Sequence, residues 1–267
     1  MRRAFRKMHG LGNDFVIFDG RDSPLEMDSA RARAIADRRT GIGCDQLILL
    51  EPSNEADVRM RIWNADGGEA EACGNAARCV ALLLAGNAWI ETAGGIIAAA
   101  AAEGEATIDM GSPRFGWNEI PLAYAMDTAS MPVGWEDLQD PFAVNVGNPH
   151  VVFFVEDSGA VDLARLGPMI ERDPLFPERV NVNVASIEDK AIRLRVWERG
   201  AGLTLACGTG ACATAVAAIS RKLVSSPVEV RLPGGALRIA WAPGGTIAMK
   251  GPAAFVFEGE IDLDAAA

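Results

Sequence analysis

The chain has 267 residues, a length that two domains of roughly 130 residues each would fill. With 49% hydrophobic and 23% charged residues, its composition is typical of a soluble globular protein. A net charge of -11 argues against nucleic-acid or anionic-membrane partners, and no apolar run is long enough to predict a membrane span. We therefore expect a small-molecule partner and, because the first residues do not resemble a signal peptide, a cytoplasmic location.

Strands and helices alternate in the first half of the chain. Strands are expected over residues 15–19, 46–50 and 58–64. Helices are expected from a cap at Asp28 to about Arg39, and over residues 75–84. Residues 113–121 have the composition of a linker, so we place the first domain at residues 1–117.

The second half repeats this alternation. Strands are expected over residues 151–155, 181–187, 192–198 and 228–232, with a helix over residues 209–223. The second domain is placed at residues 118–254. A last strand, within residues 255–267, is expected to return to the first domain.

The two halves also share sequence, which indicates an internal duplication. Residues 60–81 align without gaps on residues 194–215, an offset of 134, with eight identical positions in 22. Upstream, at an offset of 135, four residues of 12–18 match residues 147–153. A weaker third pairing sets residues 46–51 beside residues 183–188. We predict an α/β fold of two pseudo-symmetric domains, each a mixed sheet or barrel around a central helix, with the active site in the cleft between them.

Five cysteines are an odd number, so a disulfide framework is not expected. Their spacing gives no CxxC or Cys/His cluster, and the chain has only two histidines, so no metal site is expected either. Cys44, Cys79 and Cys212 are interpreted as inert core residues.

Cys73 and Cys207 occupy equivalent positions of the duplication, and each lies where an extended segment turns through a glycine into a predicted helix. A helix N-terminus favours a thiolate, and its unpaired amides can bind an anion. Two such helix ends facing one cleft could hold a carboxylate between two sulfurs. One thiolate could then remove an α-proton while the other thiol returns a proton from the opposite face, which inverts the stereocentre.

This chemistry requires no cofactor. A pyridoxal mechanism needs a Schiff-base lysine, and none of the four lysines lies in an evident phosphate-binding loop. We therefore predict a cofactor-independent amino-acid epimerase.

Several motifs in order along nearly the whole chain resemble the diaminopimelate epimerase family. They read KMHGLGNDFVIFD, GIGCDQLI, WNADGGEAEACGNAARC, GNPHVVFF, NVNVASI, RVWERGAGLTLACGTGACA and GPAAFVFEGEI. The resemblance implies conversion of LL-diaminopimelate to the meso form, a step of lysine and peptidoglycan-precursor biosynthesis, and it suggests a homodimer. Cys73 would be the proton donor and Cys207 the acceptor in that direction.

The resemblance also implies roles for residues around the cysteines. His150 and Glu198 would tune the thiols, and Arg199 can hold the distal carboxylate in a bidentate contact. The implied substrate-binding residues are Asn13, Gln46, Asn64, Gly74, Asn75, Asn148, Asn183, Glu198, Arg199, Gly208 and Thr209.

Less specific interpretations remain open for these residues. His150 and the asparagines could serve turns alone, and Glu198 with Arg199 could be a surface ion pair. A two-cysteine proline or hydroxyproline racemase is the alternative enzyme. A non-catalytic amino-acid-binding protein and a dithiol redox protein are alternatives from other classes.

Overall fold

The computed structural model describes residues 2–264, and the chain divides into two compact units. The first unit comprises the residues up to Ile108 together with those from Gly251 onward, and the second runs from Asp109 to Lys250. The second unit thus begins before the expected boundary at residue 118, because the proline-rich segment 113–121 is packed into it: Arg114 and Asn145 exchange two backbone hydrogen bonds.

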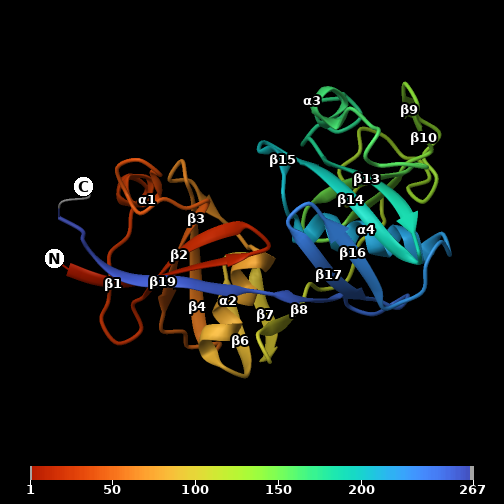
Figure 1. Ribbon diagram of the computed structural model, residues 1–267. Coiled ribbons are helices and arrows are strands. Elements are labelled where there is room, and N and C mark those ends of the chain that lie inside the picture. Colours follow the sequence, from red (N-terminus) through yellow and green to blue (C-terminus); the bar gives the residue numbers. More distant parts are fainter. Residues whose placement is uncertain (1, 265–267) are drawn as a thin grey trace. The chain divides into compact units, whose positions relative to one another are not determined.

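The first unit contains two helices and a set of strands (Figure 1). The helices are α1 (Ser29–Ala36) and α2 (Gly74–Leu84). The strands are β1 (Arg2–Gly10), β2 (Asn13–Asp19), β3 (Gln46–Glu51), β4 (Val58–Asn64), β5 (Glu69–Ala70), β6 (Asn87–Thr92), β7 (Gly95–Ala102), β8 (Glu105–Asp109) and β19 (Ala254–Asp262).

The second unit also contains two helices and a set of strands. Its helices are α3 (Leu163–Glu171) and α4 (Gly208–Ser220). Its strands are β9 (Gly134–Trp135), β10 (Leu138–Gln139), β11 (Phe142–Asn145), β12 (Pro149–Phe154), β13 (Asn181–Glu188), β14 (Ala191–Glu198), β15 (Gly202–Thr204), β16 (Val228–Leu232), β17 (Gly235–Ala240) and β18 (Ala248–Pro252).

Strand pairing is the same in both units. The antiparallel pair β1–β2 is followed by the parallel pair β2–β3, and β4 then pairs antiparallel with β3 and parallel with β6. The second unit repeats each of these pairings with β11, β12, β13, β14 and β16. The α/β class and the duplication predicted from the sequence are thus confirmed.

Strand register corrects the third repeat pairing. Phe15 pairs with Gln46 in the first unit, and His150, 135 residues further on, pairs with Asn181 in the second. Gln46 therefore corresponds to Asn181, and the pairing that set it beside Asn183 was wrong by two residues. The shared glutamates Glu51 and Glu188 that suggested it are not structural equivalents.

The central helix of the second unit is built from small residues. α4 packs against β11, β12, β13, β14, β16 and β17, and its residues from Gly210 to Ala218 are buried. A helix enclosed on all sides by a curved sheet has no polar face, and alanine lets the strands approach closely. α2 is packed on β1, β6 and β7 and keeps a more amphipathic pattern.

Helix boundaries differ from expectation in the first unit. α1 ends at Ala36 rather than near Arg39, because the Asp37 carboxylate accepts hydrogen bonds from the backbone amides of Arg39 and Thr40 and forms a turn there. The hairpin between β1 and β2 turns through Leu11 and Gly12, which both have positive φ, as a two-residue turn of this kind requires.

Several elements were not predicted. They are α3 and the strands β1, β5, β6, β7, β8, β9, β10, β11, β15, β17 and β18. α3 contains Gly167 and Pro168, which both disfavour a helix. Gly167 is required by packing, since a Cβ atom there would lie 2.5 Å from Cγ of Trp197.

The strand expected within residues 255–267 is β19, which pairs antiparallel with β1 in the first unit (Figure 1). The last three residues of that range lie outside the described residues. Within residues 2–264, no helix is long and apolar enough to cross a membrane.

We expect Gly167→Ala to destabilise the second unit by about 1–3 kcal/mol, because the added methyl group overlaps the inner atoms of the Trp197 side chain. Urea unfolding would measure the change. Gly94→Ala is the matched control, since a Cβ there meets only ordinary contacts at 3.4 Å or more. Equal stability of both variants would contradict the packing argument.

Candidate active site

Each unit contains a helix that begins directly after a cysteine. Cys73 is the N-cap of α2 with extended backbone (φ -148°, ψ 111°), and Cys207 is the N-cap of α4 with nearly the same backbone (φ -125°, ψ 109°). In the second unit the sulfur itself caps the helix, since the amide of Gly210 donates to Cys207 Sγ at 3.4 Å. Both cysteines thus lie at the positive end of a helix, beside amides that have no partner within the helix itself.

Predicted binding residues of the first unit gather at one edge of its sheet. Asn13 and Gln46 begin the parallel strands β2 and β3, and Asn64 ends the antiparallel strand β4. Gln46 Nε2 donates to Asn64 Oδ1 at 2.9 Å. Among the described residues, the buried Gln46 Oε1 atom has no partner, so it remains available to a donor.

A directed chain of hydrogen bonds orients Asn13. The buried Arg78 donates to Asn75 Oδ1 (2.9 Å), Asn75 Nδ2 donates to Asn13 Oδ1 (3.0 Å), and Asn13 Nδ2 donates to Asp45 (3.0 Å). A guanidinium can only donate and a carboxylate can only accept, so both ends give the chain the same direction. The Asn13 carbonyl is therefore the group that meets the Cys73 thiol, at 4.0 Å.

Cys207 lies in a more enclosed environment. Its side chain is in contact with Glu198, and Thr209 Oγ1 lies 3.5 Å from its sulfur. Burial and the Glu198 carboxylate raise the pKa of the Cys207 thiol well above its usual range, although Thr209 and Gly210 lower it by hydrogen bonding. Burial also raises the pKa of Glu198, which accepts a hydrogen bond from Thr204. Both shifts favour the neutral, protonated forms, so the Cys207 side chain is a thiol in this environment.

His150 is completely buried and is linked to two asparagines. Its Nε2 atom lies 2.8 Å from Asn148 Oδ1, and its Nδ1 atom lies 3.1 Å from Asn183 Nδ2. Burial, helped by the positive charge of Arg199, lowers the pKa of His150 to about 3. Its hydrogen bonds go to these two amides rather than to a sulfur, so the expected effect of His150 on the thiols stays a prediction.

Asn181 is a site residue that the sequence reasoning missed. Its Oδ1 accepts the backbone N–H of Arg199 at 2.9 Å, and its Nδ2 donates to the Pro149 carbonyl at 2.8 Å. Like Asn181, the predicted binding residue Asn183 is buried. The NVNVASI motif contains both asparagines, and they share one face of the strand. The motif alone does not say which of them corresponds to Gln46, whereas the strand register shows that it is Asn181.

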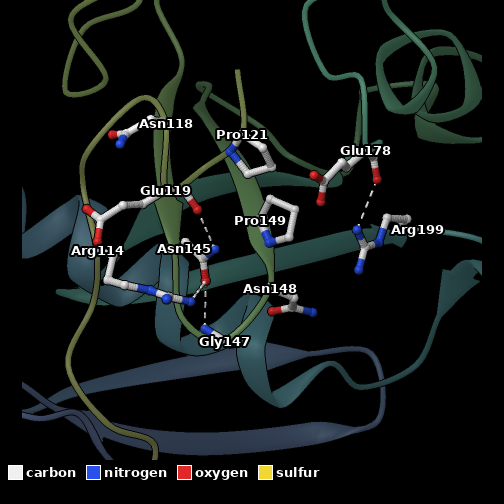
Figure 2. A pocket seen from close by; sticks show the side chains of 10 residues that line it. All are labelled: Arg114, Asn118, Glu119, Pro121, Asn145, Gly147, Asn148, Pro149, Glu178 and Arg199. Atoms are coloured by element: carbon white, nitrogen blue, oxygen red, sulfur yellow. Dashed lines mark hydrogen bonds between the residues drawn. The ribbon is translucent and has the colours of Figure 1, made fainter. Parts of the chain in front are cut away.

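A cavity of about 380 Å³ opens beside Asn148 and Arg199 (Figure 2). Asn145 connects two other residues that line the cavity, because its Oδ1 atom accepts hydrogen bonds from the Gly147 amide (2.9 Å) and from Arg114 (3.0 Å). The Arg199 guanidinium is held by the Glu178 carbonyl at 3.0 Å. The residues around the cavity are Arg114, Asn118, Glu119, Pro121, Asn145, Gly147, Asn148, Pro149, Glu178 and Arg199.

Steric crowding explains why a glycine occupies position 210. A Cβ atom there would lie 2.7 Å from Asn183 Oδ1 and 3.3 Å from Cys207 Cβ. The equivalent position of the first unit is Ala76, which is buried. In the same unit, Ile48 of β3 takes the place that Asn183 has in β13.

The remaining cysteines are buried, as interpreted from the sequence. Burial raises the pKa of Cys44 to about 11 and that of Cys79 to about 12, so both are thiols at neutral pH. No group of three or more His, Cys, Asp or Glu side chains within residues 2–264 is arranged to hold a metal ion.

Comparison with known proteins gives consistent matches over the chain. The family model described as diaminopimelate epimerase matches residues 5–116 and 142–256. A diaminopimelate epimerase of Rhizorhabdus wittichii is 66% identical over 267 residues, covering 99% of this chain and 97% of its own.

Solved structures share the fold at much lower identity. A PhzF-family phenazine biosynthesis protein of Bacillus anthracis has a TM-score of 0.71 at 16% identity, covering 98% of this chain and 99% of its own. A hydroxyproline epimerase of Agrobacterium vitis has a TM-score of 0.67 at 15% identity, covering 97% and 92%.

We expect His150 to make the protein less stable in acid. Its pKa is about 3 in the folded protein and about 6.5 in an unfolded chain, so the unfolded state binds the proton first. The free energy of unfolding should therefore fall as the pH drops from about 6.5 towards 3, by about 2 kcal/mol at pH 5. Urea unfolding at pH 7 and pH 5 should show a smaller loss in His150→Gln. The same loss in both proteins would contradict this expectation.

Proposed function

Because this chain belongs to the diaminopimelate epimerase family, we propose that it converts LL-diaminopimelate to meso-diaminopimelate without a cofactor. The observation that carries the proposal is the duplicated placement of Cys73 and Cys207, each at the N-cap of a helix in its own unit. In this proposal the two sulfurs act on opposite faces of one α-carbon.

The reaction moves two protons and no other group. In the LL-to-meso direction, the Cys207 thiolate takes the α-proton, and the Cys73 S–H bond breaks to give its proton to the carbanion from the other face. Each step of general acid or base catalysis of this kind typically contributes about 10²–10⁴-fold. The enzyme then holds a Cys207 thiol and a Cys73 thiolate, so a proton must be exchanged before the next turnover in that direction.

Glu198 is proposed to assist Cys207. Its carboxyl group lies against the thiol. In this proposal it takes the sulfur's proton, which leaves a thiolate. The amides at the start of α4 then stabilise the thiolate and the charge that develops on the substrate carboxylate. Gly208 and Thr209 in α4, and Gly74 and Asn75 in α2, are the proposed contacts.

Substrate specificity is proposed to come from the polar groups around the cysteines. The distal end of diaminopimelate carries both an ammonium and a carboxylate group. The cavity beside Arg199 offers groups of both signs, with Arg114 and Arg199 as cations and Glu119 and Glu178 as anions. The proposed contacts in the first unit are Asn13, Gln46 and Asn64, and the unpaired Gln46 Oε1 supports a donor at that position.

Two further proposals concern the assembly and its location. We propose a homodimer formed through β19, where the three successive residues Phe255, Val256 and Phe257 are 46–54% exposed. Exposed apolar patches of this kind mark protein interfaces. The cytoplasm is the proposed location, which agrees with an odd number of cysteines.

The decisive test is incubation with LL-diaminopimelate in deuterated water. We expect the protein to form the meso isomer with α-deuterium, and both Cys73→Ala and Cys207→Ala to lose epimerisation by at least about 10²-fold. Cys44→Ala is the control, because Cys44 is buried and belongs to neither α2 nor α4 nor their caps. Chiral chromatography with mass spectrometry measures both products.

Other outcomes of this assay distinguish the alternatives. Turnover of proline or hydroxyproline with inert diaminopimelate would instead indicate a racemase of that class. Retained epimerisation in Cys73→Ala would overturn the two-thiol mechanism.

The homodimer has its own test. Size-exclusion chromatography with light scattering should give a mass near twice 28.2 kDa for the unaltered protein. Phe257→Glu should give the monomer, since it places a charge in the proposed interface. Trp89→Glu, at a similarly exposed site on β6, serves as the control and should remain dimeric. A monomeric unaltered protein would refute the proposal.

A further inference from the structure

Thr204 contributes the only hydroxyl group of the hairpin that β14 and β15 form over residues 191–204. In this antiparallel pair Glu198 lies opposite Gly202, and Val196 lies opposite Thr204, so Glu198 and Thr204 are diagonal neighbours on one face. Thr204 Oγ1 donates to Glu198 Oε1 at 2.5 Å. The hydroxyl group is thus bound to one specific oxygen of the carboxyl group.

The face of the hairpin that carries this pair is turned towards the start of α4. β14 packs against α4, and a Cβ atom at position 210, in the first turn of that helix, would lie 3.1 Å from Val196 Cγ2. The Cys207 side chain, at the cap of the same helix, is in contact with Glu198. Glu198 therefore contacts both Thr204 and the Cys207 thiol.

The first unit lacks both members of this pair. At the offset of 134, Asn64 takes the place of Glu198 and Ala70 that of Thr204, and the two hairpins have the same register. Asn64 Oδ1 accepts its hydrogen bond from Gln46 instead. A threonine present for strand propensity alone would suit either hairpin. The hydroxyl group occurs in the half that carries the carboxyl group, which indicates that the two act together.

The Thr204 hydrogen bond stabilises the ionised form of Glu198. Burial raises the pKa of the Glu198 carboxyl group, and the hydrogen bonds from Thr204 and Cys207 oppose that rise. A hydroxyl group that donates to a carboxyl group lowers its pKa, because the bond is stronger when the acceptor is charged. Without Thr204, the protonated acid would persist to a higher pH.

The charged side chains on the elements packed against β14 are engaged elsewhere. Glu171 of α3 accepts hydrogen bonds from the Trp197 indole and the Gly200 amide, and Arg199 donates to the Glu178 carbonyl. α4 and β15 carry no charged side chain, and the Cys212 thiol of α4 is buried. The ion pairs on the other elements are Arg165 of α3 with Glu136, Glu188 of β13 with Arg193, and Glu229 of β16 with Arg231.

We propose that Thr204 is a positioning residue for the deprotonation of Cys207: its hydroxyl group holds one oxygen of the Glu198 carboxylate and leaves the other oxygen to take the proton of the thiol. In this step the Cys207 S–H bond breaks, an O–H bond forms on Glu198, and the electron pair stays on sulfur. The Thr204 contact persists, because a carboxylic acid still accepts at the oxygen that carries no proton. The inference deepens the proposed function of Glu198 and rests on it.

The first test removes the hydroxyl group at nearly constant side-chain volume. We expect Thr204→Val to move the acidic limb of the pH profile of kcat/KM for LL-diaminopimelate to higher pH by about one unit, because the pKa of Glu198 rises. At a pH on that limb, kcat/KM should therefore fall by up to about tenfold. Thr204→Ser keeps a hydroxyl group and should return the limb most of the way to its original position.

Thr92→Val is the matched control. Thr92 Oγ1 donates to the Gly95 carbonyl at 2.8 Å in the first unit, so this variant loses a strand hydroxyl group without touching Glu198 and should leave the limb in place. An unmoved limb in Thr204→Val would overturn the proposal. An equal loss at every pH that serine does not restore would also overturn it, since that result indicates a purely structural role.

The second test follows Glu198 without substrate. Infrared spectroscopy detects the C=O stretch of a protonated carboxyl group, and the band that disappears in Glu198→Gln belongs to Glu198. We expect this band to persist to a higher pH in Thr204→Val than in the unaltered protein or in Thr204→Ser. The same pH dependence in all three proteins would refute the role of Thr204. If diaminopimelate is not turned over, the proposed function fails, and the infrared titration still shows whether Thr204 stabilises the Glu198 carboxylate.

Discussion

The first turn of a helix leaves backbone amides without partners, and this one constraint organises both units of the protein. Something must meet the amides at the start of α2 and α4, and in each case the chain places a cysteine at the cap. A neutral thiol is a poor cap, whereas an anion is a good one. The amides therefore interact most strongly when the cysteine is a thiolate or when a carboxylate is bound, and the same amides can stabilise both anions.

Sheet topology explains why the polar residues gather around these helix ends. In each unit two parallel strands begin where an antiparallel neighbour ends, so three short segments that are distant in sequence share one edge. The first unit fills that edge with neutral amides, and the second with Asn181, Glu198 and Arg199. The duplication therefore preserved the framework, and the charge of the two edges diverged.

Both units also hold side-chain amides in place through hydrogen bonds. In the first, Arg78 at one end and Asp45 at the other direct a chain through Asn75 and Asn13. In the second, Asn183, His150 and Asn148 are linked through the histidine ring. These contacts hold the side chains in place before any ligand arrives, which lowers the cost of ordering the site on binding.

Structural elements and site residues could be predicted where the residues of the two halves could be compared. They could not be predicted where side-chain packing or strand register determines the structure. The cysteines and their helices followed from the repeat, because Gly74 and Gly208 mark the same turn into a helix. α3 could not be predicted, because Gly167 and Pro168 both disfavour a helix, and only the packing shows that Trp197 requires a glycine there. Asn181 was missed because an alignment of short strands cannot resolve a two-residue shift, whereas the backbone ladder does.

Gly210 and Asn183 have a consequence for how the halves can evolve. Ala76 and Ile48 occupy the same places in the first unit, so each unit carries a matched small-and-large pair in its core. Transferring alanine alone into the second unit drives its methyl group to 2.7 Å from the Asn183 oxygen. Transferring isoleucine alone removes the amide that lies 3.1 Å from His150 Nδ1. Neither exchange is neutral by itself, so the two positions of a unit have to change together for one half to take on the other's residues.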